Sequence, residues 1–428
     1  MSESATDEQA AEFEKATEAE LKESDVEKDR VILGRDWPGR EKEYLSTATP
    51  EAIANFAASY GDDNPLFSDP DYGRTTRWGG QIAPPIMAGV LNKPLLGPRP
   101  GKDERGGSYR GIHAFVSGGT WEWYRPIRPS DTIYSFGGLE SVELKQSEFA
   151  GRSVIKVGRR VKMNANAEVV GVYRSLTVNT ERKAARSRGK YSQLAEPHYT
   201  DEDFAEIERL YEVETRQGRA PNYYEDIQVG QALPPMVKGP LTTTDIIVFH
   251  AGGYGFVPYG LKTGRLAHEN RQRIAPFFIK NAYGVPDVAQ RVHWDSEWAQ
   301  AIGTPRAYDY GVLRECWAHH YLTNWAGDDG WVLSQHDEIR KFNYHGDVQY
   351  LSGEVVDKYQ ADGRNVVEIA FRLKNQRDEE TVKGTASIAL PSREQGPVIL
   401  PAVPIDLQRR AIEMMARHGE LLRELPGA

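Results

Sequence analysis

The chain has 428 residues, 39% of them hydrophobic, which is enough for two domains of ordinary size. Its net charge of −9 arises mostly at the N-terminus, because residues 1–30 hold eleven acidic and four basic side chains and so carry −7 of it, leaving −2 for the rest. A nearly neutral body argues against a general nucleic-acid-binding surface.

Three more features limit the class of protein. No run of the sequence approaches the roughly 18 apolar residues that a membrane span needs. The N-terminus also lacks a basic start followed by an apolar stretch. Cys316 is the single cysteine, which excludes intrachain disulfide bonds and cysteine-rich zinc sites. We therefore expect a cytoplasmic protein without membrane or nucleic-acid partners, and we interpret its acidic start as a solvated helix or a frayed tail.

The predicted elements occur twice in the same order: a helix with a Gly/Pro-rich turn, a second helix, and then alternating strands. In the first copy they cover residues 49–65, 83–96, 119–136, 152–163 and 168–178. In the second copy they cover residues 242–258, 308–326, 338–356, 365–374 and 381–390. Repetition at this length indicates two equivalent domains rather than a solenoid.

Several positions of the two copies superpose. The pairs are Phe56 and Phe249, Pro65 and Pro258, Gly89 and Gly311, and Asp131 and Asp347. The second copy carries an insertion of about thirty residues between Pro258 and its second helix, from about Tyr259 to Val292, which we expect to line or cover one cleft. Between the copies, a basic polar link is followed by a predicted helix over residues 200–214, which begins with a Thr200/Asp203 capping pattern.

This order of elements predicts an α+β protein in which each half wraps a twisted antiparallel sheet around a central helix. If the two sheets join edge to edge, two exposed sheet edges disappear. The seam between the halves would then be the natural cleft.

The first copy contains the stretches SYGDDNPLF (59–67), DPDYG (69–73) and APPIMAGVL (83–91). Together they resemble the hydratase motif of the MaoC-like (R)-specific enoyl-CoA hydratases and dehydratases, which have the hotdog fold. The motif runs approximately G-D-x-N-P-x-H. Gly61, Asp62, Asn64 and Pro65 match it, whereas Phe67 stands in place of the histidine.

The second copy keeps the other part of the motif. In VHWDSEWAQAIGTPRAYDYG (292–311), His293 stands at the position of Phe67 and Asp295 at that of Asp69. Upstream, Gly255 and Val257 stand where Asp62 and Asn64 do. The resemblance covers nearly the whole chain as two copies.

The resemblance implies two fused hotdog domains and reversible hydration of a 2-enoyl-CoA to a 3-hydroxyacyl-CoA. It implies Asp62 and His293 as acid/base groups, Asn64 as a water- or loop-positioning amide, and Gly89 or Gly311 as the backbone donor to the thioester oxygen. Such a reaction needs no metal and no redox cofactor. Coenzyme A enters only as part of the acyl-CoA thioester substrate. We also expect a homo-oligomer, with a dimer favoured.

The sequence allows two arrangements of the site. Asp62 and His293 either share one water across the seam or belong to two clefts. The second-copy helix offers Glu315 and one of His319 and His320 as further candidates, since adjacent helical residues do not face the same cleft. An acyl-CoA thioesterase and a catalytically silent acyl-binding subunit are the alternative functions.

The predicted domains follow from these patterns. They are an acidic extension (1–35), an N-terminal hotdog domain (36–185), a linker with a helix (186–235), a C-terminal hotdog domain (236–395) and a helical tail (396–428).

Overall fold

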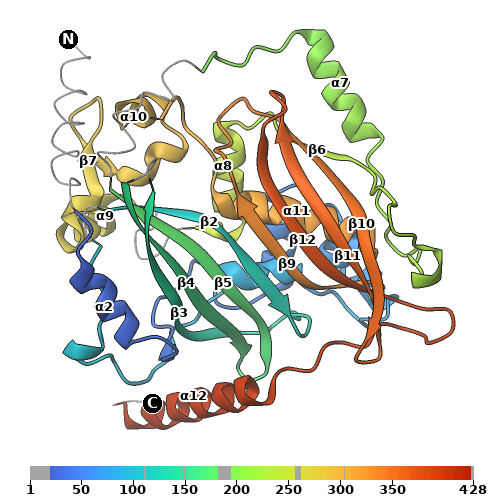
Figure 1. Cartoon of the computed structure of the whole chain (residues 1–428), viewed down its shortest axis with the longest axis horizontal. Coiled ribbons are helices and arrows are strands. Elements are labelled where there is room, and N and C mark those ends of the chain that lie inside the picture. Colours follow the sequence, from blue (N-terminus) through green and yellow to red (C-terminus); the bar gives the residue numbers. More distant parts are fainter. Residues whose placement is uncertain are drawn as a thin grey trace.

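A single ten-stranded sheet forms the framework of the molecule (Figure 1). The computed structural model describes residues 20–109, 112–147, 151–181, 194–255, 262–302 and 304–425. Val257, Pro258 and most of the predicted link before residue 194 therefore lie outside the described residues. The strand order is β1-β3-β4-β5-β2-β9-β12-β11-β10-β6, and all the neighbouring strands pair antiparallel.

The strands of each half are consecutive in the sheet. The first half contributes β1 (Trp37–Pro38), β2 (His113–Trp123), β3 (Ile133–Ser147), β4 (Gly151–Asn164) and β5 (Val169–Thr180). The second contributes β6 (Met236–Lys238), β9 (Trp331–Ile339), β10 (Gln349–Ala361), β11 (Arg364–Asn375) and β12 (Glu380–Leu390). The halves meet where β2 pairs with β9, from Gly118 opposite Glu338 to Glu122 opposite Ser334. The predicted edge-to-edge junction is confirmed.

Helix α11 (Gly311–Ala326) is the central helix of the second half, and thirteen of its sixteen residues are buried. It also contacts the first half, where the ring of His319 lies 4.6 Å from that of Trp123 on β2. The predicted second helix of the first half is instead a six-residue 3-10 turn, η1 (Pro85–Val90). Prolines at 84, 85 and 94 limit it, because proline lacks an N–H and disfavours helix in the residue before it. One long helix therefore lies beneath the joined sheet.

The remaining helices surround this framework. They are α2 (Glu23–Val31), α3 (Pro50–Ala58), α4 (Pro65–Ser68), α5 (Pro70–Arg74), α7 (Asp201–Glu212), α8 (Thr243–Phe249), α9 (Gly264–Arg273), α10 (Ser296–Ala301) and α12 (Ile405–Glu424). The Thr200 side chain accepts a hydrogen bond from the Asp203 N–H, and Asp203 accepts one from the Thr200 N–H, so the predicted capping box of α7 is confirmed. The insertion contains α9, the hairpin β7 (Phe278–Lys280) and β8 (Pro286–Val288), and the 3-10 turn η6 (Ala289–His293).

Local contacts reproduce the internal repeat. Asp69 caps α5 by accepting from the Tyr72 N–H, and Asp295 caps α10 by accepting from the Trp298 N–H. Asp131 and Asp347 each accept from the backbone N–H three residues earlier in the chain. The copies therefore share turn chemistry as well as element order.

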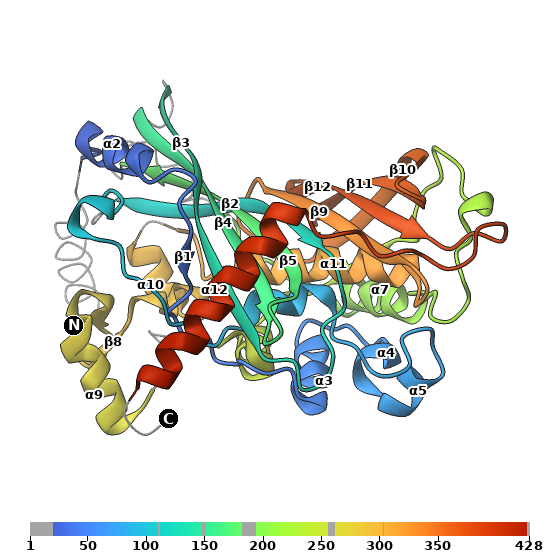
Figure 2. The same cartoon turned by 90° about the horizontal axis from the view of Figure 1, so that it is seen from below.

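Helix α12 crosses the outer face of the first-half strands diagonally (Figure 2). Its Ala411 and Met414 pack in a buried cluster with side chains from β3, β4 and β5, among them Phe136 and Met163. The chain end thus covers an apolar sheet face that would otherwise meet water.

Part of the acidic N-terminal stretch is docked rather than frayed. The buried Asp29 of α2 forms an ion pair with Lys156 of β4 at 2.8 Å and accepts a hydrogen bond from the Tyr109 hydroxyl at 2.7 Å. Leu21 and Val26 pack with Val154. The frayed-tail interpretation is therefore wrong for residues 20–31, and residues 1–19 lie outside the described part.

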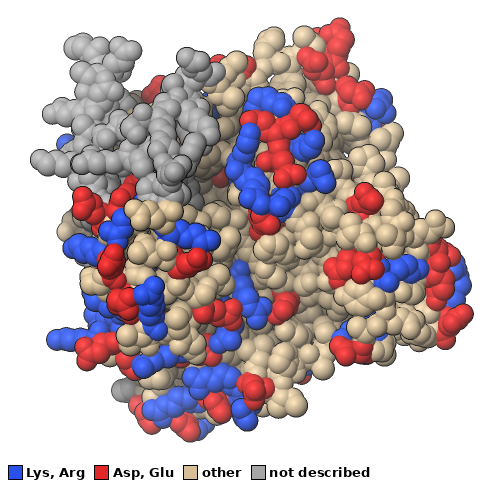
Figure 3. Space-filling view, in the orientation of Figure 1, with Lys and Arg blue, Asp and Glu red and all other residues tan. Residues whose placement is uncertain are grey.

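On the face shown in Figure 3, acidic and basic side chains are intermixed rather than segregated. In the described part of the chain, no helix is both long and apolar enough to cross a membrane.

Candidate functional site

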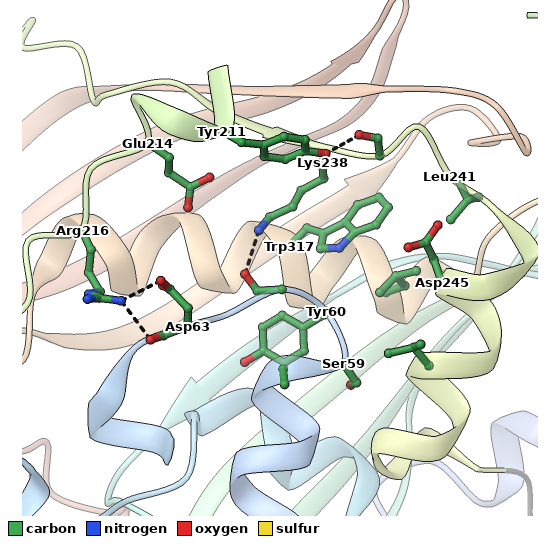
Figure 4. A pocket seen from close by; sticks show the side chains of 15 residues that line it. Ser59, Tyr60, Asp63, Tyr211, Glu214, Arg216, Lys238, Leu241, Asp245 and Trp317 are labelled. Atoms are coloured by element: carbon green, nitrogen blue, oxygen red, sulfur yellow. Dashed lines mark hydrogen bonds and ion pairs between the residues drawn. The ribbon is translucent and has the colours of Figure 1, made fainter. Parts of the chain in front are cut away.

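A pocket of about 690 Å³, here called the seam pocket, lies between the end of α3 in the first half and β6, α8 and α11 in the second half (Figure 4). Its walls come from the end of α3, the segment after α7, strand β6, helix α8 and the first half of α11. The lining residues are Ala58, Ser59, Tyr60, Gly61, Asp63, Tyr211, Glu214, Arg216, Lys238, Gly239, Leu241, Asp245, Val248, Leu313 and Trp317. Both copies of the repeat therefore contribute to one cavity.

Lys238 crosses the pocket from β6 with only 8% of its surface exposed. Its Nζ donates to the Gly61 carbonyl at 3.1 Å and lies 2.9 Å from Nδ1 of His320. Burial lowers the pKa of Lys238, while the charges of Glu214 and Asp62 oppose that shift. The first-half turn is thus tied to the second half through one buried amine.

Asp62 lies directly behind this lysine, within the turn that matches the hydratase motif. Its Oδ1 accepts from the Asn64 N–H at 3.1 Å, its Oδ2 accepts from the Tyr60 hydroxyl at 3.3 Å, and Oδ1 lies 3.7 Å from Nε2 of His320. Burial raises the pKa of Asp62 to about 7. The α11 candidate that faces Asp62 is therefore His320.

The lysine contact fixes the tautomer of His320. A protonated lysine has only donors, so Nδ1 of His320 must accept from it, and Nε2 then carries the hydrogen that points toward Asp62. Burial and the Lys238 charge hold the pKa of His320 well below its usual range. With its lone pair already engaged, His320 is poorly placed to take a proton from water.

Asn64 shapes the turn. Its Oδ1 accepts from the Leu66 N–H at 2.9 Å, which caps α4, and its Nδ2 donates to Asp328 at 3.1 Å. Phe67, at the motif's histidine position, is 3% exposed and belongs to the main hydrophobic core. Asn64 therefore holds the turn, and Phe67 anchors it in the core.

His293 lies elsewhere, beside the start of α11. Its Nδ1 is 2.9 Å from the Tyr308 carbonyl oxygen, and its ring lies 3.8 Å from the ring of Tyr310, the N-cap residue of α11. A carbonyl only accepts, so Nδ1 carries the hydrogen and Nε2 carries the lone pair. Burial lowers the pKa of His293 to about 3, which keeps the imidazole neutral. This histidine is the one in the orientation of a base.

A hydrogen-bond network surrounds Tyr310. Its hydroxyl accepts from Nε2 of Gln290 at 3.0 Å and lies 3.1 Å from Nε2 of His250. Burial lowers the pKa of His250 to about 4. Gln290 stands three residues before His293, as Asn64 stands three before Phe67, so an amide is present at the motif's spacing in both copies.

The two candidate glycines differ. Gly311 is the first residue of α11, and no side chain caps that helix, so the N–H groups of its first turn are oriented as an anion site requires. Gly89 lies within η1, with the Trp121 ring 3.4 Å from where a Cβ would be. Because η1 is not the start of a long helix, the structure gives Gly311 and not Gly89 the geometry expected of an oxyanion donor.

The structure does not bring Asp62 and His293 together. Asp62 contacts His320, and His293 contacts Tyr310. From Tyr310, the N-cap of α11, to His320 there are ten residue steps, which span about 15 Å along the helix axis. One water bridges groups only about 5.5 Å apart, two hydrogen-bond lengths. Of the two arrangements left open by the sequence, the structure has the one with a half-motif in each of two places.

An aspartate would not fit at Gly255, the position of the second copy that corresponds to Asp62. The φ of Gly255 is +40°, and a Cβ there would lie 2.4 Å from the Cβ of Tyr44. Only glycine fits such a position without a shift of the neighbouring residue. At the motif's own spacing, five residues before His293, the chain carries the buried Val288.

The other candidates on α11 and in the insertion face different surroundings. His319 Nδ1 lies 3.0 Å from Gln335 Oε1, beneath the sheet. Glu315 accepts from the Tyr173 hydroxyl at 3.0 Å, and burial raises its pKa to about 7. Asp287 bonds to Asn281 within the β7–β8 hairpin.

Sequence reasoning missed Lys238, Tyr310 and Gln290. Lys238 is the last residue of the short strand β6, outside the repeated motif, and nothing in its sequence context marks it. The spacing of Gln290 from His293 was available as a signal, because it equals the spacing of Asn64 from Phe67.

Comparisons with known proteins agree with this architecture. Residues 38–172 match the family model described as the FAS1-like dehydratase domain region. A solved MaoC-like dehydratase has a TM-score of 0.54 and 14% sequence identity, over 85% of this chain and 99% of its own. The chain therefore shares the fold of that dehydratase, with two hotdog halves joined in one sheet. This confirms the expected α+β fold class.

Two further proteins are similar to this chain. A UPF0336 protein of Streptomyces avermitilis is 26% identical over 143 residues, which are 33% of this chain and 89% of the relative. A conserved hypothetical protein of Mycobacterium tuberculosis, described as having a double hotdog fold, is 11% identical with a TM-score of 0.45, over 85% of this chain and 97% of its own. The match of residues 38–172 to the dehydratase-region model is the finding that points toward a dehydratase function.

Proposed function

We propose that this protein catalyses the reversible hydration of a 2-enoyl-CoA to a 3-hydroxyacyl-CoA, with His293 as the base that activates water. One observation carries the proposal: the bond from Nδ1 of His293 to the Tyr308 carbonyl leaves the lone pair on Nε2, in a ring that packs on Tyr310, the residue before the uncapped start of α11. A base and a group of backbone donors therefore lie at the same end of one buried helix.

The chemistry needs both groups. Water gives a proton to Nε2 of His293 as its oxygen bonds to C3 of the enoyl group, and the electron pair of the C2–C3 double bond moves toward the thioester oxygen. The N–H of Gly311 and its neighbours stabilise the negative charge that develops there. The proton held by His293 then passes to C2, which completes the addition of water.

A pKa near 3 makes the imidazole of His293 a weak base before the reaction starts. Its proton affinity rises during the reaction itself. Burial among aromatic rings disfavours the imidazolium form of His293. Negative charge growing on a thioester oxygen nearby favours that form, so proton affinity rises as the transition state is approached. We propose that Gln290 and His250, through the Tyr310 hydroxyl, hold the ring against which His293 packs.

In this proposal the first-half motif residues act indirectly. Asp62 and Asn64 hold the turn at the seam and its link to α11, as their hydrogen bonds indicate. Gly89 has no part in the reaction.

The test is a hydration assay on the purified chain with enoyl-CoAs of several chain lengths, followed by loss of the enoyl-thioester absorbance and by release of free thiol. Wild type should hydrate at least one of them, and His293→Ala should lower kcat/KM by about 10²–10⁴-fold, the usual worth of a general base. His336→Ala is the matched control, because that histidine is partly exposed on β9 and contacts Thr120.

Three results would contradict the proposal. They are the absence of hydration with every substrate, thiol release in its place, and full activity of His293→Ala together with loss of activity in Asp62→Asn. The second outcome indicates a thioesterase, and the third moves the reaction to the seam pocket.

A further inference from the structure

The seam pocket takes no part in the proposed reaction, yet it has the features of a ligand site. It lies on the face of α11 that presents Leu313 and Trp317, whereas His293 packs at the start of that helix. Its volume of about 690 Å³ lies within the range of small-molecule sites. A cavity of this size at the seam of two halves requires an explanation of its own.

Lys238 supplies a directed polar group in that cavity. Two of its three ammonium hydrogens are used, one by the Gly61 carbonyl and one by Nδ1 of His320. The third has no acceptor among the described residues, while the side chain lines the pocket (Figure 4). Holding a cation with 8% exposure is costly, and a ligand atom that accepts this last hydrogen would offset part of the cost.

The charges around the pocket select the kind of acceptor. Asp63, Glu214 and Asp245 line it against two cations, Lys238 and Arg216, and Arg216 is already paired with Asp63 at 2.8 Å. Asp62 adds a further carboxyl group directly behind the lysine. An incoming carboxylate or phosphate would meet this acidic surplus and be repelled.

Part of the remaining lining is apolar. Trp317, Leu313, Leu241 and Val248 contribute hydrocarbon surface, and Tyr60 contributes an aromatic ring. Such a surface binds a hydrocarbon body through burial of apolar area.

We infer that the seam pocket is a second ligand site, which binds an uncharged acyl compound by donating a hydrogen bond from Lys238 to its carbonyl oxygen and by packing its hydrocarbon part on Trp317 and Leu313. The site excludes the corresponding free carboxylate. It binds without hydrating, because the lone pair of His320 is held by Lys238 and Phe67 replaces the histidine of the motif.

The experiment uses two probes of the same shape, hexanamide and hexanoate, with binding to the full-length chain measured by calorimetry at pH 8. Hexanamide should bind with one site per chain, and hexanoate at least tenfold more weakly. The N-acetylcysteamine thioester of hexanoic acid, which has the thioester but no nucleotide phosphates, should bind like the amide.

Two variants locate the site. Lys238→Met removes the donor at similar length and should weaken hexanamide binding by tenfold or more. Val248→Trp keeps every ion contact of the pocket and should block binding by filling space, so a folding defect in the lysine variant would not decide the outcome.

Equal binding of hexanoate and hexanamide, or unchanged hexanamide binding in Val248→Trp, would overturn the inference. Because these readouts are binding constants, a failure of the proposed hydration leaves them interpretable. Hexanamide binding that disappears in His293→Ala but persists in Val248→Trp would place the ligand beside His293, at the start of α11, and also overturn the inference.

Discussion

Replacing Asp62 with asparagine should change how the stability of the protein depends on pH. Burial raises the pKa of Asp62 to about 7 in the folded protein, from an ordinary value of 3.8. Between these two values the folded chain holds a proton that the unfolded chain has lost. This contribution to stability is therefore complete below about pH 4 and is lost as the pH rises to 7.

The size of the effect follows from those two values. Each tenfold change in proton affinity corresponds to about 1.4 kcal/mol, so ionising Asp62 between pH 5 and pH 8 should cost the folded state about 3 kcal/mol. Asp62→Asn cannot ionise and should lose that part of the pH dependence. Other buried carboxyl groups, such as Glu315, remain in both proteins and cancel in the comparison.

Urea unfolding at pH 5 and pH 8 measures this difference directly. The fall in unfolding free energy between the two pH values should be about 3 kcal/mol larger in wild type than in Asp62→Asn. Asp63→Asn is the control, because its side chain is 77% exposed and next in sequence. An identical pH dependence in wild type and Asp62→Asn would refute the argument that burial, opposed only in part by hydrogen bonds and the Lys238 charge, raises the pKa of Asp62.

Two other substitutions test the positions of structural side chains. Asn64→Ala removes the cap of α4 and the bond to Asp328, and urea unfolding should show a loss of about 2 kcal/mol, near the upper end for a helix cap; a loss below about 0.5 kcal/mol would contradict the structural role of Asn64. Thr200→Ala breaks the capping box of α7 and should speed hydrogen exchange at the start of that helix, with little change at α11; unchanged exchange in α7 would contradict it.

Much of the fold could be predicted because the sequence states it locally. The capping pair Thr200 and Asp203 marks the start of α7, and the alternation within 152–163 and 168–178 marks two paired strands. The duplication predicted the edge-to-edge sheet, since two equal units with exposed edges have one economical way to join.

The predicted central helix of the first half is wrong, and the reason appears only when the local sequence and the packing of the two halves are considered together. Residues 83–96 have helical apolar spacing, but three prolines restrict them to a 3-10 turn, and α11 from the other half occupies the space below the sheet. Tertiary packing overrides local pattern in such a case.

The individual candidate residues of the site could be predicted from the sequence, but their positions relative to one another could not. Asp62, Asn64, His293 and Gly311 were found through motif spacing, whereas the separation of Asp62 from His293 depends on which part of α11 each contacts. The orientation of the two histidines depends on Lys238 and on the Tyr308 carbonyl, and backbone carbonyl directions leave no mark in a sequence.

The most direct test of His293 as the base is the pH dependence of kcat/KM for hydration, since that profile reports groups of the free enzyme. A base with a pKa near 3 stays unprotonated, so the rate should hold steady between pH 8 and pH 5. If Asp62 were the base, its pKa near 7 would halve kcat/KM at about pH 7, and kcat/KM would fall tenfold for each pH unit below that value. A flat profile supports His293 as the base, and a fall centred near pH 7 contradicts that assignment.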